Sequence, residues 1–152
     1  MLSTPMLPPC PATIAVLCGG GWLRHELTAS VSDAYLQAGF TVIAQDVVLG
    51  EHLAAMTALI RSRPLLVVVL APQPAGIAAR ETARGKTAYG PWAIGQLDDL
   101  LRYRTPCLGL WLDTTGQSPA ETVDEILSRA WTEAVIPGKP SEDARSSGSS
   151  GI

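Results

Sequence analysis

Three charged side chains in the sequence have the types and spacing that phosphate chemistry requires. Asp46 comes near the end of the apolar stretch FTVIAQDVVLG, where a carboxylate holds Mg²⁺ or acts as a base toward a hydroxyl. Arg80 and Arg84 are four residues apart, so on a helix they share one face and together clamp phosphate oxygens. Structural alternatives stay open. Asp46 caps the following helix or turn equally well, and for the arginines a solvated charged face is favoured on spacing alone.

Two stretches invite comparison with phosphate-binding loops. A Walker A loop follows the pattern GxxxxGK[ST], in which backbone N–H groups, a lysine and a hydroxyl surround the phosphates and Mg²⁺. In CGGGWLRHELT, residues 18–28, neither a lysine nor a hydroxyl stands at the required offset, so a flexible connector is favoured over a weak anion nest. RGKT, residues 84–87, has no glycine five residues before Gly85, although the charge of Lys86 remains of interest.

The other polar candidates favour structural roles. Asp113 is the last residue of the stretch CLGLWLD, and Thr114 begins the turn that follows it. Short polar side chains at such a turn usually hydrogen-bond to nearby backbone groups. His25 and His52 have no companions at metal-ligand spacing, so they are expected at the surface or at helix ends. We therefore predict no metal site built by these side chains alone.

Strands and helices alternate along the chain, and they must position these residues. Strands are predicted from residue 13 and at 40–50, 65–71 and 107–113, and helices at 23–38, 51–62, 74–84, 92–102 and from 118 onward. This alternation implies right-handed crossovers and a parallel sheet of about four strands. LLVVVLA is apolar on both faces, as a central strand requires. Ligands collect at the carboxyl edge of such sheets, which is where Asp46 and Asp113 fall.

Helical spacing also predicts which sides of the helices are buried. The inward residues are expected to be Leu23, Leu27, Val31, Ala34 and Ala38 in the first helix, Ile94, Leu97 and Leu101 in the fourth, and Val123, Ile126, Leu127, Ala130 and Trp131 in the last. Asp98 and Arg102 are expected to pair, and SPAE at 118–121 predicts a capped helix start.

Composition predicts one globular domain, since the chain has 152 residues, of which 47% are hydrophobic and 16% charged. We expect a single α/β domain at 13–136 between a disordered leader, 1–12, and a disordered tail, 137–152. A net charge of −3 without a basic cluster disfavours nucleic acid and anionic membranes. The absence of a signal-like or membrane-spanning run and three cysteines without ligand spacing indicate a cytoplasmic protein with a small-molecule or protein partner.

Four segments in order, AGFTVIAQDVVLG, LLVVVLAP, ARETARGK and LWLDTTGQSPAETVDEIL, resemble the P-loop phosphotransferases of the chloramphenicol phosphotransferase-like family, kin to nucleotide and shikimate kinases. The resemblance covers roughly 27–130, and RETARG is its most specific element. It implies a three-layer α/β/α fold with a mostly parallel sheet, like that of nucleoside kinases, and ATP and Mg²⁺ as cofactors. It also implies that Arg80 and Arg84, with Lys86, lie at the ATP phosphates, Asp46 beside Mg²⁺ and the acceptor, and the turn of Asp113 and Thr114 near the adenine.

The sequence departs from that family at its beginning. Enzymes of this kind open with a strand, the Walker A loop, its helix and a strand with a catalytic aspartate, whereas here CGGGW stands in their place. We therefore expect an N-terminally truncated, ATP-dependent phosphotransferase that moves a γ-phosphoryl group to a small-molecule hydroxyl and is impaired by loss of the P-loop. The alternatives are a non-catalytic nucleotide- or protein-binding module, and a fragment whose uncovered apolar face favours a homodimer.

Overall fold

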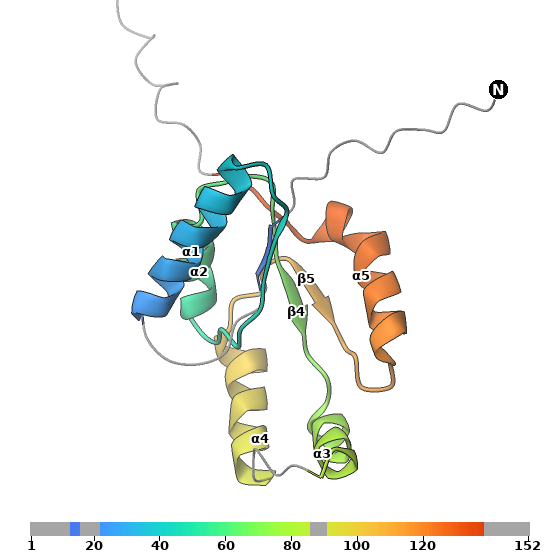
Figure 1. The fold of residues 1–152 in the computed structure, drawn as a ribbon. Helices are drawn as coiled ribbons and strands as arrows, with labels where there is room; N and C mark the ends of the chain where they lie inside the picture. The colour runs from blue at the N-terminus through green and yellow to red at the C-terminus, as the bar shows by residue number, and fades with distance from the viewer. Residues whose placement is uncertain (1–12, 16–21, 86–90, 139–152) are drawn as a thin grey trace, which may run out of the picture.

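The computed structural model describes residues 13–15, 22–85 and 91–138, and these form a mixed α/β structure, as predicted (Figure 1). The elements are β1 (Thr13–Ala15), α1 (Trp22–Gln37), β2 (Val42–Ala44), α2 (His52–Leu59), β3 (Leu65–Leu66), β4 (Val68–Leu70), α3 (Pro74–Ala83), α4 (Pro91–Asp99) with a π-helical turn at Leu100–Arg104, β5 (Leu110–Leu112), α5 (Pro119–Glu133) and β6 (Val135–Ile136). The predicted leader 1–12, Gly19 to Gly21, Lys86 and residues 139–152 lie outside the described residues.

The strands run parallel, with one exception. β1 pairs in parallel with β2 and β3, and β4 pairs in parallel with β5. β3 and β4 are successive pieces of the predicted central strand. Between them, the Val67 N–H donates to the Ala134 carbonyl and the Val67 carbonyl accepts from the Leu110 N–H, both at 2.9 Å. The exception is β6, which is antiparallel to β3 and which the sequence analysis did not predict.

The central strand packs on both of its faces, which explains its unbroken apolar sequence. Leu65 and Val67 belong to a cluster with residues of α1 and α2, whereas Leu66 and Val68 pack against β5 and α5. Figure 1 shows α1 and α2 on one side of the strands and α5 on the other. The strands form two sheets, a four-stranded one in the order β2-β1-β3-β6 and a two-stranded one of β4 and β5, where a single parallel sheet of about four strands was predicted. Val67 joins them, and Asp46 and Asp113 follow the carboxyl ends of β2 and β5.

The predicted orientation of α1 is wrong. Leu23, Leu27 and Val31 are 66%, 55% and 52% exposed, and the buried residues are His25, Ala29 and Ser32. Small side chains on this inner side allow α1 to approach α2 closely, so packing selects the side with less apolar bulk. His25 was expected at the surface or at a helix end; it lies in the first turn of α1, but it is only 7% exposed.

The predicted buried side of α5 is correct only in part. Ala130 is buried and Ile126 packs against the core, but Val123, Leu127 and Trp131 are 51%, 67% and 47% exposed.

Local signals were predicted more accurately. Ser118 and Glu121 form the expected capping box at the start of α5. Asp98 and Arg102 form an ion pair at 2.8 Å, and Ile94 is buried. Gly39 has a φ of 87° just after α1, as its C′ position requires. Over the part of the chain that is described, the helices are too short or too polar to cross a membrane.

Candidate functional site

Asp46 lies just beyond the carboxyl end of β2 and is almost completely buried. Its Oδ1 accepts a hydrogen bond from the Val47 N–H at 3.0 Å, and its Oδ2 accepts one from Nη2 of Arg24 on α1. The Asp46 side chain is 2% exposed, whereas the Arg24 side chain is 39% exposed. The carboxylate is thus held inside the molecule by an arginine that reaches it from the surface.

The electrostatics at Asp46 are a balance of opposing effects. Burial raises the pKa of the Asp46 carboxyl because desolvation disfavours the charged form, and this effect exceeds the lowering by the Arg24 guanidinium and, more weakly, by His25. The His25 ring lies 5.9 Å from the ring of His52. Nε of Arg24 and Nδ1 of His25 are buried with no hydrogen-bond partner among the described residues.

Sequence reasoning missed Arg24. A usable signal existed, because a carboxylate at the end of a buried strand needs a nearby cation. The helix that precedes the strand offers only one arginine, in its first turn. The pairing could be found only by assuming that this end of the helix returns to the carboxyl edge of the sheet.

A cavity of about 260 Å³ lies beside Asp46. Apolar side chains from α2 and β4, including Leu53, Met56 and Val69, make up most of its wall, and polar side chains enter the lining at Gln45, Asp46 and Thr57. Among the residues that the structure describes, each carboxylate oxygen of Asp46 has a single hydrogen-bond partner, which leaves each oxygen acceptor capacity. The cavity therefore combines apolar walls with a carboxylate that accepts a hydrogen bond, a usual design for small organic ligands.

A second group of predicted residues lies at the turn after β5. Nη2 of Arg80, on α3, donates to the Thr114 carbonyl and, at 3.3 Å, to the Gln117 carbonyl. Thr114 is 3% exposed. Arg80 and Thr114 are thus brought together, but the Arg80 guanidinium donates to backbone carbonyl groups of the protein and is not directed toward a ligand in solvent.

The predicted local bonding of Asp113 is confirmed. Its Oδ1 accepts hydrogen bonds from the N–H of Thr115, at 2.9 Å, and from the Thr115 hydroxyl, and its Oδ2 accepts one from Nε2 of Gln73 at 3.2 Å. These bonds lower the pKa of the Asp113 carboxyl. Asp113 therefore stabilises the turn and ties it to the start of α3.

The two predicted arginines do not form one clamp. Arg84 is exposed at the C-cap of α3, one turn after Arg80, whose guanidinium is turned to the Thr114 turn. Arg102, which was predicted only as the partner of Asp98, also contacts the end of β4. Its Nη2 lies 3.3 Å from the Ala71 carbonyl, at the end of β4, and its neighbour Leu101 lines the cavity beside Asp46.

The described residues do not by themselves complete a site for ATP and Mg²⁺. Mg²⁺ is held by carboxylates together with substrate phosphates, and no group of three or more His, Cys, Asp or Glu side chains occurs in the described ranges. Asp46 is the one buried carboxylate among these residues, and it is already paired with Arg24.

Comparisons of the chain with models of protein families, with curated proteins and with solved structures find no match.

Proposed function

We propose that the chain is a phosphotransferase-like protein whose Asp46 cavity binds a small, largely apolar acceptor that carries a hydroxyl group. The observation that carries this proposal is the position of a buried carboxylate in the wall of an apolar cavity, at the carboxyl edge of parallel strands. The ligand's hydroxyl would donate to Asp46, while its apolar body would contact Leu53 and Met56 of α2.

The fold that we propose is the three-layer, P-loop nucleoside-kinase-like fold. Two features support it: the parallel pairs β2–β1–β3 and β4–β5, and helices on both sides of them (Figure 1). The resemblance of RETARG and DTTGQSPAETVDEIL to that family falls on α3 and on the turn and helix after β5. Arg80 connects these two segments directly.

In this proposal ATP with Mg²⁺ supplies the γ-phosphoryl group, and transfer is impaired. Phosphoryl transfer depends on positioning and charge stabilisation, which the Walker A lysine and backbone normally provide. The printed sequence contains no GxxxxGK[ST]. Arg24 pairs with Asp46 and Arg80 bonds to carbonyl groups, whereas Arg84 is exposed at the C-cap of α3.

The second candidate is a non-catalytic binding module that keeps the fold. The Arg24–Asp46 ion pair favours it, because the arginine lowers the basicity of the carboxylate below that of the same buried group without a partner and competes with Mg²⁺ for its oxygens. Both candidates retain the small-molecule cavity, and they differ in what they predict for ATP.

Binding of benzyl alcohol, with toluene as the matched probe without a hydroxyl, tests the cavity. We expect calorimetry to show tighter binding of benzyl alcohol, and we expect Asp46→Leu to remove about a tenfold preference by deleting one hydrogen bond to a charged group. Equal affinity for the two probes in the wild-type protein would overturn the proposed role of Asp46. Far-UV circular dichroism of the variant controls for folding.

The two candidates are separated by γ-radiolabelled ATP. If transfer is retained, label appears on benzyl alcohol slowly, disappears in Asp46→Asn and falls in Arg84→Ala. If the protein is a non-catalytic binding module, neither the wild type nor any variant transfers more label than a protein-free blank. Calorimetry then gives an affinity for ATP weaker than millimolar.

A further inference from the structure

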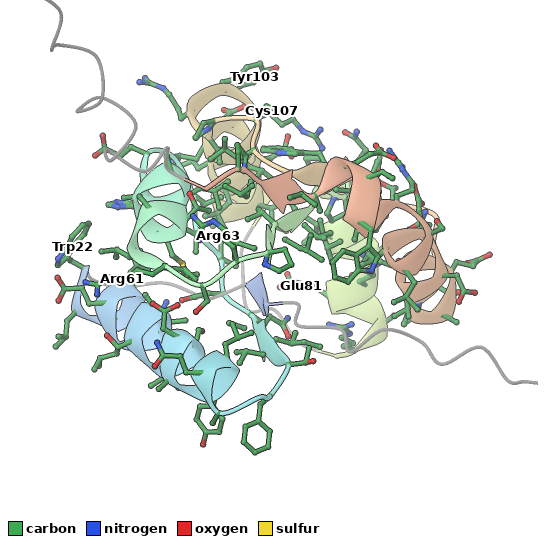
Figure 2. All side chains as sticks on the ribbon, turned by 90° about the horizontal axis from the view of Figure 1, so that it is seen from above. Trp22, Arg61, Arg63, Glu81, Tyr103 and Cys107 are labelled. Carbon is green, nitrogen blue, oxygen red and sulfur yellow. The ribbon has the colours of Figure 1, made fainter. Side chains whose placement is uncertain are left out.

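α1 presents its apolar side chains to solvent. Leu23, Leu27, Val31 and Tyr35 recur every fourth residue and are 66%, 55%, 52% and 54% exposed. Phe40, which is 59% exposed, packs edge-on against Tyr35 with ring centroids 5.7 Å apart. We call these five residues the outer stripe. In Figure 2, α1 lies along one edge of the molecule, and Trp22 in its first turn projects outward.

The charged residues of α1 are directed mostly away from this stripe. Arg24 bonds to Asp46, and the carboxylate of Asp33 accepts hydrogen bonds from the backbone N–H groups of Arg61, at 3.1 Å, and Ser62, at 2.9 Å. Glu26 accepts from Nε1 of Trp22 at 2.6 Å. A surface helix normally turns its apolar side inward and its charges outward. α1 does the reverse, which indicates that its outer side is covered in the functional assembly.

We infer that the outer stripe of α1 is a homodimer interface, covered by α1 of a second copy of this chain. Side chains of this size at half exposure each present on the order of 100 Å². The stripe therefore offers on the order of 500 Å² per copy, and two copies bury about 1,000 Å², the size at which specific association begins. An interface at this lower limit is expected to be reversible.

The stripe is complementary to itself in the antiparallel direction. A two-fold axis between Leu27 and Val31 places Leu23 of one copy opposite Tyr35 of the other, so the bulky end of each helix meets the less bulky end of its partner. None of the five stripe residues is charged, so neither an acidic nor a basic partner surface would gain an ion pair there.

A similar exposed group on α5, formed by Val123, Leu127 and Trp131, provides a matched control. α5 lies on the opposite side of the strands from α1 (Figure 1). Unlike α1, it exposes a charged row in which Arg129 pairs with Glu125 and Glu133. A change from leucine to arginine is therefore possible at comparably exposed positions on both helices, Leu27 and Leu127.

Sedimentation velocity over a series of micromolar concentrations tests the interface. The wild-type protein should pass reversibly from 16.0 kDa to twice that mass. Leu27→Arg should remain monomeric, because two desolvated arginines would face the partner's apolar stripe, whereas Leu127→Arg should dimerise like the wild type. Circular dichroism should show unchanged helix content in both variants, since both positions are exposed.

A rescue experiment tests the antiparallel arrangement. Mixing Leu27→Glu with Val31→Lys should restore a dimer that neither variant forms alone, because residue 27 of one copy faces residue 31 of the other. A wild-type protein that stays monomeric throughout the series would overturn the inference. A dimer that survives Leu27→Arg, or one that Leu127→Arg alone disrupts, would overturn it as well.

Discussion

At Asp46, burial and an ion pair have opposite effects on the pKa of one carboxyl group. The carboxylate is surrounded by apolar residues of the cavity wall, and one arginine provides its counter-charge. The pKa of Asp46 is nevertheless raised, because burial outweighs Arg24. Because burial and Arg24 shift the pKa of Asp46 in opposite directions, the effect of removing Arg24 on the stability of the fold should depend on pH in a predictable direction.

Arg24→Met should destabilise the protein by about 2 kcal/mol at neutral pH, less than the loss of a fully buried pair because Arg24 is 39% exposed. Without Arg24 the pKa of Asp46 rises further. An acid whose pKa is higher in the folded state binds more protons there, so stability falls as pH rises through that pKa. The cost of Arg24→Met should therefore shrink as the pH is lowered, which urea unfolding at several pH values will measure.

The double variant Arg24→Met, Asp46→Asn is the control for this prediction. Because the amide does not ionise, the stability difference between this double variant and Asp46→Asn alone should lose most of its pH dependence. Persistence of the same pH dependence in that difference would mean that another group is responsible.

Arg80 and Arg84 are expected to contribute differently to the stability of the protein, although both belong to RETARG. Arg80→Ala removes the hydrogen bonds to the Thr114 and Gln117 carbonyls and should cost about 1.5 kcal/mol. Arg84→Ala, at an exposed C-cap, should change stability by less than about 0.5 kcal/mol. Chemical denaturation compares them, and equal effects would contradict the structural role assigned to Arg80.

Among the elements, the junction of β3, β4 and β5 depends on Gly109. A Cβ built there would lie 2.2 Å from the Val67 carbonyl oxygen, and the φ of Gly109 is +71°. The same carbonyl accepts the hydrogen bond from Leu110 that starts β5, so it cannot move away without breaking the strand pair.

Gly109→Ala should therefore destabilise the protein by about 4 kcal/mol, from both the clash and the left-handed backbone. Gly39→Ala is the matched control, because Gly39 also has a positive φ, of 87°, but open space around its Cβ position. It should cost only about 1 kcal/mol. Thermal unfolding gives both values, and similar costs for the two would mean that the strands yield at Gly109.

The sequence allowed the positions of most elements to be predicted, because their signals are local. Ser118 with Glu121, Gly39, and the apolar run at 65–71 each indicated the observed feature. The inward side of α1 could not be predicted, since one side of the helix has large apolar residues and the other has small ones. Which side packs depends on how closely α2 approaches, and that is a property of the tertiary structure.

At the scale of the whole molecule, the parallel strands bring together residues that are far apart in sequence. Asp46 and Asp113 were both predicted to follow the carboxyl ends of strands, and each does: Asp46 follows β2 of the four-stranded sheet and Asp113 follows β5 of the two-stranded sheet. Their partners Arg24 and Gln73 were not predicted, because each comes from an element whose direction only the folded chain defines. β6 was missed for a similar reason, since two residues after a helix carry no periodicity.

The central claim is that a small molecule with a hydroxyl group binds in the cavity beside Asp46. Methyl-resolved NMR during titration with benzyl alcohol tests this most directly. We predict saturable shifts of the Leu53, Met56 and Val69 methyl signals, while the methyl signals of the exposed Leu127 on α5 stay unchanged. Shifts confined to the exposed apolar residues of α1 and α5, or no saturable shifts at all, would contradict the claim.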